Sequence, residues 1–262
     1  MAYIKEYWEN KDQRAQRARK HTTEMQKLHG DKITQSIKNT KIYDTDFICN
    51  GDIVNELEEP TKIIVADADT VMASGKYSDG KTALLNFSSY KNPGGMFLNG
   101  SKAQEECLCH DSYLYNVLSQ FVKDFYDWNN QHKNKALYLN RGLYTPNIVF
   151  QYDGSEIYRD VITCAAPNKS AAQKYQNVSD TENTKVLKSR IKFVLDIAKD
   201  NEVEVLILGA YGCGVFGQNP VEVAMIFKEC LETTYKNCFR KVVFAIPSGR
   251  DGNLEAFKSV FE

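Results

Sequence analysis

The sequence has no excess charge of either sign and no long apolar run. Its 262 residues carry 33 basic and 34 acidic side chains, for a net charge of -1, which provides no general attraction to nucleic acid or to a membrane surface. No apolar stretch approaches the length of a membrane-spanning helix, and the N-terminus shows no segment of the signal-peptide type. We therefore expect neither membrane association nor direct, sequence-specific binding of nucleic acid.

Cysteines in paired spacing are also absent. The seven cysteines show no such spacing, and together with the missing secretory leader this indicates a reducing compartment, so we expect a cytoplasmic protein. Cys107, Cys109 and His110 lie close together, but structural zinc sites usually need a second pair of ligands, and the sequence offers no second close-spaced Cys/His pair. We expect no metal and no cofactor.

Residues 3–41 are polar and favour a helix, with a basic cluster in the middle of the segment. One interpretation is a basic helical surface that follows an anionic polymer. The other is a solvated helical extension, because charge runs usually mark solvated faces. The basic residues are Arg14, Arg17, Arg19 and Lys20. The residues that would anchor the extension are Tyr7, Trp8, Met25, Leu28 and Ile33.

Beyond residue 51 the sequence changes to short apolar runs that alternate with helical patterns. Near-continuous apolar strands separated by helices indicate a sheet covered on both faces, and hence the α/β class. Pro220 is typical of the first turn of a helix. The predicted strands are residues 62–66, 82–87, 147–152, 161–164, 203–208 and 241–246. The predicted helices follow residue 104 as far as 128, occupy 183–198, follow residue 220, and run from 254 to the end.

A glycine turn followed by two acids is the most informative feature of the chain. Gly94 and Gly95 carry no Cβ, so their backbone can approach a ligand closely, and the N–H groups of such a turn can surround phosphate or ribose oxygens. Glu105 and Glu106 follow Gln104 at the expected start of a helix, where negative charge is favoured. Paired carboxylates are what cleavage of a glycosidic bond requires. The alternative is a plain tight turn and two acids that only stabilise a helix start.

A second glycine loop follows the strand predicted at residues 203–208. It satisfies the GxGxxG pattern, but a dinucleotide-binding fold also needs a following strand that ends in an acid, and here only one more strand follows. The backbone N–H groups of a glycine loop before a helix still suit a diphosphate. Phe216 either lines the ligand or belongs to the core, and Cys213 is interpreted as a small residue, not a nucleophile. The loop residues assigned to ligand binding are Gly212, Cys213, Gly214, Val215 and Phe216.

These segments together resemble the bacterial-type poly(ADP-ribose) glycohydrolases, a branch of the macrodomain superfamily. The family signature is a glycine triplet followed shortly by QEE, and Gly94-Gly95-Met96 stands in place of the triplet, with Met96 replacing the third glycine. Residues 161–168 resemble the family's central strand and its following turn, and residues 203–216 resemble its second phosphate-binding loop. The resemblance spans roughly residues 45–262.

The resemblance implies a three-layer α/β/α sandwich with a mixed central sheet. It implies that Glu106 is the catalytic general acid/base and that Glu105 binds the sugar. It assigns Asn92 and Gln104 to ADP-ribose binding, together with the residues of the two glycine loops. In macrodomains the position after the first core strand faces the adenine, which would be Asp67 here, although capping of a helix by Asp69 or Thr70 is an equal alternative. No role is assigned to Asn168, which ends another strand.

The expected function is therefore that of a poly(ADP-ribose) glycohydrolase, which hydrolyses the ribose–ribose O-glycosidic bond and releases ADP-ribose without a metal. Two alternatives remain open: a hydrolase that removes single ADP-ribose groups from protein or nucleic acid, and a non-catalytic ADP-ribose-binding macrodomain. The expected partner is poly(ADP-ribose) or an ADP-ribosylated macromolecule, and we expect a monomer. We expect a helical extension over residues 1–45 and a catalytic domain over residues 46–262.

Overall fold

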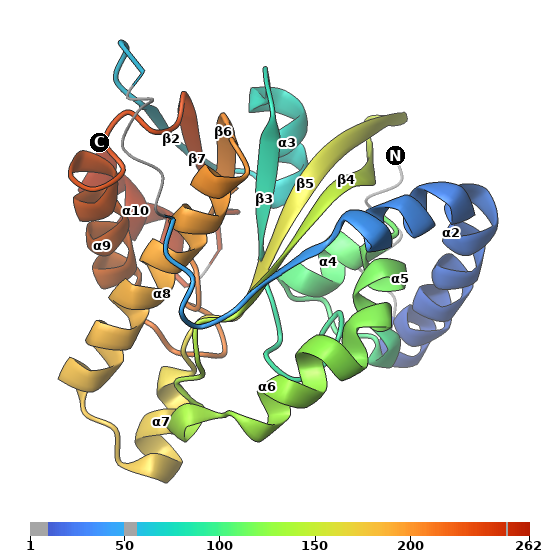
Figure 1. The fold of residues 1–262 in the computed structure, drawn as a ribbon, viewed down its shortest axis with the longest axis horizontal. Coiled ribbons are helices and arrows are strands. Elements are labelled where there is room, and N and C mark those ends of the chain that lie inside the picture. Colours follow the sequence, from blue (N-terminus) through green and yellow to red (C-terminus); the bar gives the residue numbers. More distant parts are fainter. Residues whose placement is uncertain (1–9, 50–56, 250) are drawn as a thin grey trace.

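The computed structural model describes residues 10–49, 57–249 and 251–262. Within these residues a seven-stranded sheet lies between two layers of helices (Figure 1). The strands are β1 (Lys41–Tyr43), β2 (Lys62–Ala66), β3 (Thr82–Phe87), β4 (Gly142–Tyr152), β5 (Ser155–Cys164), β6 (Val205–Leu208) and β7 (Lys241–Ala245). The α-helices are α2 (Lys11–Asn39), α3 (Thr70–Tyr77), α4 (Gln104–His110), α5 (Leu114–Leu118), α6 (Trp128–Gln131), α7 (Lys169–Gln176), α8 (Asp180–Asp200), α9 (Pro220–Glu232) and α10 (Asn253–Phe261). Short helical segments are η1 (Phe97–Asn99), η2 (Ser119–Phe121), η3 (Val122–Asp127) and η4 (Asn134–Ala136).

The order of the strands in the sheet is β1-β4-β5-β3-β6-β7-β2. β4 runs antiparallel to both of its neighbours, whereas β5, β3, β6, β7 and β2 are mutually parallel. The carboxyl ends of the parallel strands therefore meet at one edge of the sheet. Open α/β sheets bind their ligands in the crevice outside this edge.

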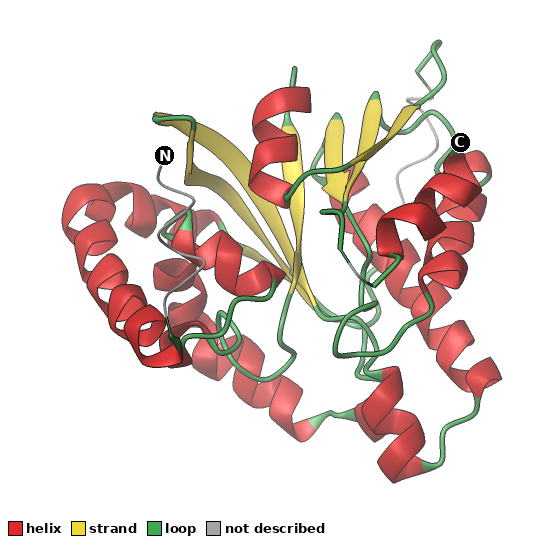
Figure 2. Cartoon of the chain, turned by 180° about the vertical axis from the view of Figure 1, so that it is seen from behind, coloured by secondary structure: helices red, strands yellow, loops and turns green. Residues whose placement is uncertain are grey.

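Each face of the sheet has its own hydrophobic core. Helices α8, α9 and α10 cover one face, and α2, α3, α4 and α5 cover the other (Figures 1 and 2). Along β3, Leu85 packs into the first core and Leu84 into the second, because successive side chains of a strand point to opposite faces. Both leucines are fully buried, which contributes roughly 1.5–3 kcal/mol each. The predicted three-layer α/β/α sandwich with a mixed sheet is confirmed.

All six predicted strands are present, and the predicted helix after Pro220 is α9, which begins at that proline. Strands β4 and β5 begin earlier than predicted, at Gly142 and Ser155. Three elements were missed. β1 has only three residues, and α3 and α7 are each eight residues long. The capping alternative for Asp69 is confirmed, since its side chain accepts a hydrogen bond from the Met72 N–H at 2.8 Å.

The prediction of a helix continuing from residue 104 to 128 was wrong, because the segment is broken into α4, α5, η2, η3 and α6. Ser112 explains the first break. Its hydroxyl donates to the Leu108 carbonyl at 2.6 Å and accepts from the Leu114 N–H at 3.0 Å, so a side chain replaces main-chain helical partners. Leu114 and Val117 are nonetheless fully buried, as their helical spacing predicted.

Helix α2 packs along the side of the sheet that carries α4 and α5 (Figure 1). Ile33 is buried and Met25 is partly buried against this core, as the sequence predicted for an anchored extension. Leu28 was wrongly predicted as an anchor, since 71% of its surface is exposed. Tyr7 and Trp8 lie outside the described residues.

Candidate active site

The glycine turn after β3 lies directly on the two glutamates. Gly94 and Gly95 have φ angles of 64° and 60°, in the left-handed region that favours glycine. A Cβ on Gly95 would stand 2.6 Å from Oε1 of Glu106 and 2.9 Å from Oε2 of Glu105. The missing side chain is therefore what allows the turn to approach both carboxyls.

Met96 does not need to be a glycine in this turn. Its φ is -110°, which any residue can adopt, and 44% of its surface is exposed. Its N–H donates to Oε1 of Glu106 at 2.8 Å. The departure from the glycine triplet therefore leaves intact the hydrogen bond that joins the turn to the second glutamate.

Glu106 joins the glycine turn to the start of α4. Besides Met96, it accepts a hydrogen bond from the Ala103 N–H through Oε2, at 2.8 Å. Ala103 is the N-cap of α4, so this contact also satisfies an N–H group that the helix leaves without a partner. The side chain is buried but borders the turn. Glu106 therefore stabilises the helix start, as the alternative interpretation proposed, and presents a fixed carboxylate to whatever the turn binds.

Glu105 lies deeper and carries the perturbed acid group. It accepts hydrogen bonds from Asn86 Nδ2 at 3.2 Å and from the Ser89 N–H at 2.7 Å. Burial raises the pKa of Glu105 to about 8, against the opposing effect of these donors and with a smaller contribution from the charge of Glu106. At neutral pH its carboxyl is mostly protonated and can donate a hydrogen bond to a sugar hydroxyl.

Gln104 holds α4 against the end of the central strand. Its Oε1 accepts from the Phe87 N–H at 2.8 Å, and its Nε2 donates to the Leu85 carbonyl at 2.8 Å and to Thr70 Oγ1 at 3.2 Å. The amide is occupied by the protein itself. Its side chain therefore positions the helix that carries the two glutamates, and ligand binding by Gln104 stays a prediction.

The second glycine loop emerges beside the first, because β6 pairs in parallel with β3. Gly212 has a φ of 76°, and a Cβ there would stand 2.8 Å from Ala166. Gly214 borders open space, and 88% of the Val215 surface is exposed. Burial raises the pKa of the Cys213 thiol to about 12, which agrees with its interpretation as a small residue and not as a nucleophile.

Phe216 links the two loops through an aromatic cluster. Its ring lies 6.1 Å from that of Tyr138, and Tyr138 stacks on Tyr90 with ring centroids 4.1 Å apart. Tyr90 belongs to the segment between β3 and the glycine turn. Phe216 is partly buried against this cluster, so it contributes to packing at the same time as it borders the second loop.

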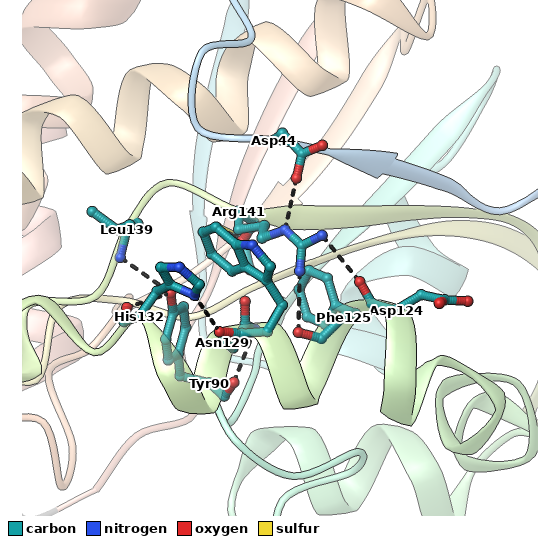
Figure 3. Close-up of polar contacts among 10 residues, drawn as sticks. Asp44, Tyr90, Asp124, Phe125, Asn129, His132, Leu139 and Arg141 are labelled. Carbon is teal, nitrogen blue, oxygen red and sulfur yellow. Dashed lines mark hydrogen bonds and ion pairs between the residues drawn. The ribbon is translucent and has the colours of Figure 1, made fainter.

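A buried arginine, Arg141, holds the segment behind the first loop, and no motif in the sequence predicted this role (Figure 3). Arg141 Nε donates to Asp44 Oδ1 at 2.7 Å, and its Nη atoms donate to the carbonyls of Asp124 and Phe125. The guanidinium carbon lies 4.3 Å from the centroid of the Trp128 ring. These contacts hold the η3–α6 segment at Arg141, the residue directly before β4.

That fixed segment in turn holds Tyr90 (Figure 3). Asn129 Nδ2 donates to the Tyr90 carbonyl at 2.9 Å, and the Tyr90 hydroxyl donates to the carbonyl of His132 at 3.0 Å. The Leu139 N–H donates to the same hydroxyl at 3.3 Å. The loop that leads to Gly94 is therefore held by both its main chain and its side chain.

The remaining predicted residues lie around these loops. Asn92 is exposed, and its carbonyl accepts from the Gly95 N–H at 3.1 Å. Asp67 accepts from the Ser248 N–H at 2.7 Å at the end of β2, three strands from β3 and thus roughly 14 Å away across the sheet. Asn168 caps α7 through its hydrogen bond from Ala171.

Two structural absences hold for the described part of the chain. No group of three or more His, Cys, Asp or Glu side chains there has the arrangement of a metal site. Among the same residues, no helix is both long enough and apolar enough to cross a membrane.

A glycine turn that supports two buried carboxyls, beside a second glycine loop at the carboxyl edge of a mixed sheet, defines a macrodomain-type hydrolase site. Residues 11–153 match the family described as microbial-type PARG, catalytic domain, where PARG is poly(ADP-ribose) glycohydrolase. The chain belongs to this family.

Solved structures agree with the family. The poly(ADP-ribose) glycohydrolase of Thermomonospora curvata is 27% identical, with a TM-score of 0.83 over 95% of this chain and 99% of that one. A second structure of that enzyme, bound to the inhibitor ADP-HPD, is 28% identical over the same shares of the two chains, with a TM-score of 0.82. The Deinococcus radiodurans enzyme in complex with ADP-ribose is 29% identical, with a TM-score of 0.76 over 88% of this chain and 97% of that one. No curated protein gave a significant match.

Proposed function

We propose that this protein is a poly(ADP-ribose) glycohydrolase, which hydrolyses the ribose–ribose bond of the polymer and releases ADP-ribose. Membership of the microbial-type family and the likeness to enzymes solved with ADP-ribose and ADP-HPD support this. The observation that carries the proposal is the position of Glu106, which the Met96 and Ala103 N–H groups hold at 2.8 Å each beside the Gly94–Gly95 turn.

In the proposed reaction, Glu106 acts as general acid and then as general base. Its carboxyl donates a proton to the leaving ribose oxygen as positive charge develops on the sugar, and its carboxylate then takes a proton from the attacking water. Glu105 donates a hydrogen bond to a hydroxyl of the same ribose, since its raised pKa keeps it protonated at neutral pH. The two hydrogen bonds to Glu106 fix the carboxyl before substrate arrives, which is the source of much of an enzyme's rate.

The two glycine loops bind the ADP-ribose unit in this proposal. Gly94, Gly95 and the exposed side chain of Asn92 surround the distal ribose, and the loop from Gly212 to Phe216 binds the diphosphate through its N–H groups. Asp67 stands at the far end of the same edge, where a carboxylate suits the exocyclic amine of adenine. We propose that the reaction needs no metal, since both proton transfers are assigned to a carboxyl. Turnover that is unchanged in EDTA supports this, and its loss contradicts it.

The proposal extends to the organisation and location of the protein. We propose a catalytic domain of residues 46–262 with an N-terminal extension over residues 1–45, whose described part packs on that domain through α2 and adds the edge strand β1 to its sheet. Seven free thiols fit a reducing compartment, and we propose the cytoplasm. We propose that the protein works as a monomer. Light scattering of the purified protein tests this, and a dimer mass contradicts it.

Two substrates distinguish this function from that of a mono-ADP-ribosyl hydrolase. The purified protein is incubated with poly(ADP-ribose) and, in parallel, with a protein that carries single ADP-ribose groups. We expect ADP-ribose release from the polymer alone. Release from the mono-modified protein, with the polymer left intact, contradicts the proposal and identifies a mono-ADP-ribosyl hydrolase.

A further inference from the structure

A polar groove of about 430 Å³ lies between α2 and the α5–η2 segment, outside the site described above. Ligand sites in proteins commonly have volumes in this range. The lining consists of hydroxyl and amide side chains and one lysine, namely Thr22, Thr23, Gln26, Lys27, Asn116, Ser119 and Gln120. Such a lining offers many hydrogen-bonding groups and little apolar surface.

Asn116 has a buried acceptor without a partner beside this groove. Its Nδ2 donates to the Thr22 carbonyl at 3.0 Å and approaches Gln26 Oε1 at 3.4 Å. Its Oδ1 has no hydrogen-bond partner among the described residues, although the side chain is buried. Buried acceptors are nearly always paired in native proteins, with protein groups or with ordered water. The groups that a sugar hydroxyl can reach are instead the exposed side chains of Thr23, Gln26 and Gln120.

Positive charge lies along the same face of α2. Arg19, Thr23 and Lys27 follow one another at a spacing of four residues, which places them on one side of the helix. Both cations are exposed, and at the rise of an α-helix their backbones are about 12 Å apart. Hydroxyl and amide groups therefore lie between two cations, which matches a ligand in which sugars alternate with phosphates.

The same short helix, α5, contributes one residue to the groove and the preceding one to the glycine turn. Tyr115 precedes Asn116 on α5, and its ring lies against the glycine turn: a Cβ on Gly94 would stand 2.7 Å from Tyr115 Cδ2. Burial raises the pKa of Tyr115, and the nearby charge of Arg19 opposes that rise. The charge of Arg19 therefore acts on the residue that borders the turn.

We propose that this α2–α5 groove binds the unit of poly(ADP-ribose) next to the one that is released. The proposal rests on the proposed function. Arg19 and Lys27 pair with phosphates of that unit, and its ribose hydroxyls form hydrogen bonds with the exposed side chains of Thr23 and Gln26. Helix α2 thereby contributes to recognition of the polymer as well as to packing.

The test is a double charge reversal, Arg19→Glu with Lys27→Glu, in the full chain. The matched control is Lys185→Glu with Lys236→Glu, which makes the same charge change at exposed lysines in α8 and after α9. We expect the groove variant to raise KM for long polymer about tenfold or more, with kcat and the Kd of free ADP-ribose within about twofold of wild type. A KM equal to that of the control overturns the proposal, and so does an equal loss of ADP-ribose binding.

Polymer binding, measured by fluorescence anisotropy in a Glu106→Gln background, keeps this test separate from the proposed function. If the wild type does not cleave polymer, the proposed function is overturned. Polymer binding that still depends on Arg19 and Lys27 then supports the groove as a polymer-binding surface, and binding that does not depend on them overturns the groove as well. If the wild type cleaves polymer and the groove variant behaves as the control, only the groove is overturned. Poly(A) RNA that competes as well as poly(ADP-ribose) also overturns the assignment and identifies an RNA-binding surface.

Discussion

Adding one methyl group at Gly95 should lower the rate of catalysis by about 10²-fold or more while leaving the protein folded. In Gly95→Ala, the new Cβ would stand 2.6 Å from Oε1 of Glu106, so the carboxyl must move. The hydrogen bond from Met96 to the same oxygen would be strained or lost. Hydrogen bonds to charged groups contribute about 1.5–3 kcal/mol, and a misplacement of about 1 Å at a reacting group costs about 10²-fold in rate.

Gly154→Ala is the matched control for the backbone. Gly154 has a φ of 75°, but nothing lies within 4 Å of an added Cβ. Both variants force alanine into the left-handed region, at about 1–2 kcal/mol, so both should lose a few degrees of thermal stability. Initial rates of ADP-ribose release from polymer, measured on folded protein, should fall at least 10²-fold in Gly95→Ala only. A Gly95→Ala enzyme within about threefold of the control would refute the steric reasoning.

Three further changes test other parts of the site. Gln104→Ala leaves the Phe87 N–H and the Leu85 carbonyl without their partner and should cost about 2–4 kcal/mol of unfolding free energy; an unchanged Tm contradicts this. Because the pKa of Glu105 is raised to about 8, the folded state binds an extra proton between the ordinary carboxyl pKa and 8, so stability should fall with rising pH by up to about 1.4 kcal/mol per unit. Urea unfolding at pH 6 and pH 9 measures this fall in the free energy of unfolding, and Glu105→Gln should remove it. A pH dependence of stability that persists in the variant excludes Glu105 as its cause. Arg141→Lys loses the fixed donors to the Asp124 and Phe125 carbonyls and should lower both the Tm and the affinity for ADP-ribose. Calorimetry that finds the affinity unchanged shows that the contacts of Arg141 are not coupled to the ligand site.

The layers of the fold were predictable because they depend on local apolar patterns. Strands β3 and β6 are short apolar runs, and α9 begins with a proline at the position that favours one. The break after α4 was not predictable from spacing. Ser112 ends the regular helix through its side chain, and its carbonyl accepts from His21, a residue of α2 far away in the sequence.

The glycine turn and the two glutamates were also predictable, since their chemistry is carried by adjacent residues. The residues that hold the site in place could not be predicted. Arg141 meets Asp44, which lies 97 positions away, and Asn129 meets Tyr90 across 39 positions. Gln104 stands inside the recognised motif, yet the sequence does not show that the main chain of β3 occupies its amide. Tertiary contacts decide such roles.

The central claim is that Glu106 transfers the proton that breaks the ribose–ribose bond. Glu106→Gln keeps the size of the side chain and an oxygen that can accept from Met96 or Ala103, but it removes the acid. In single-turnover assays with poly(ADP-ribose), we predict that ADP-ribose release falls by 10²–10⁴-fold, while calorimetry finds the affinity for free ADP-ribose within about threefold of wild type. Release by Glu106→Gln at more than a tenth of the wild-type rate would contradict the account.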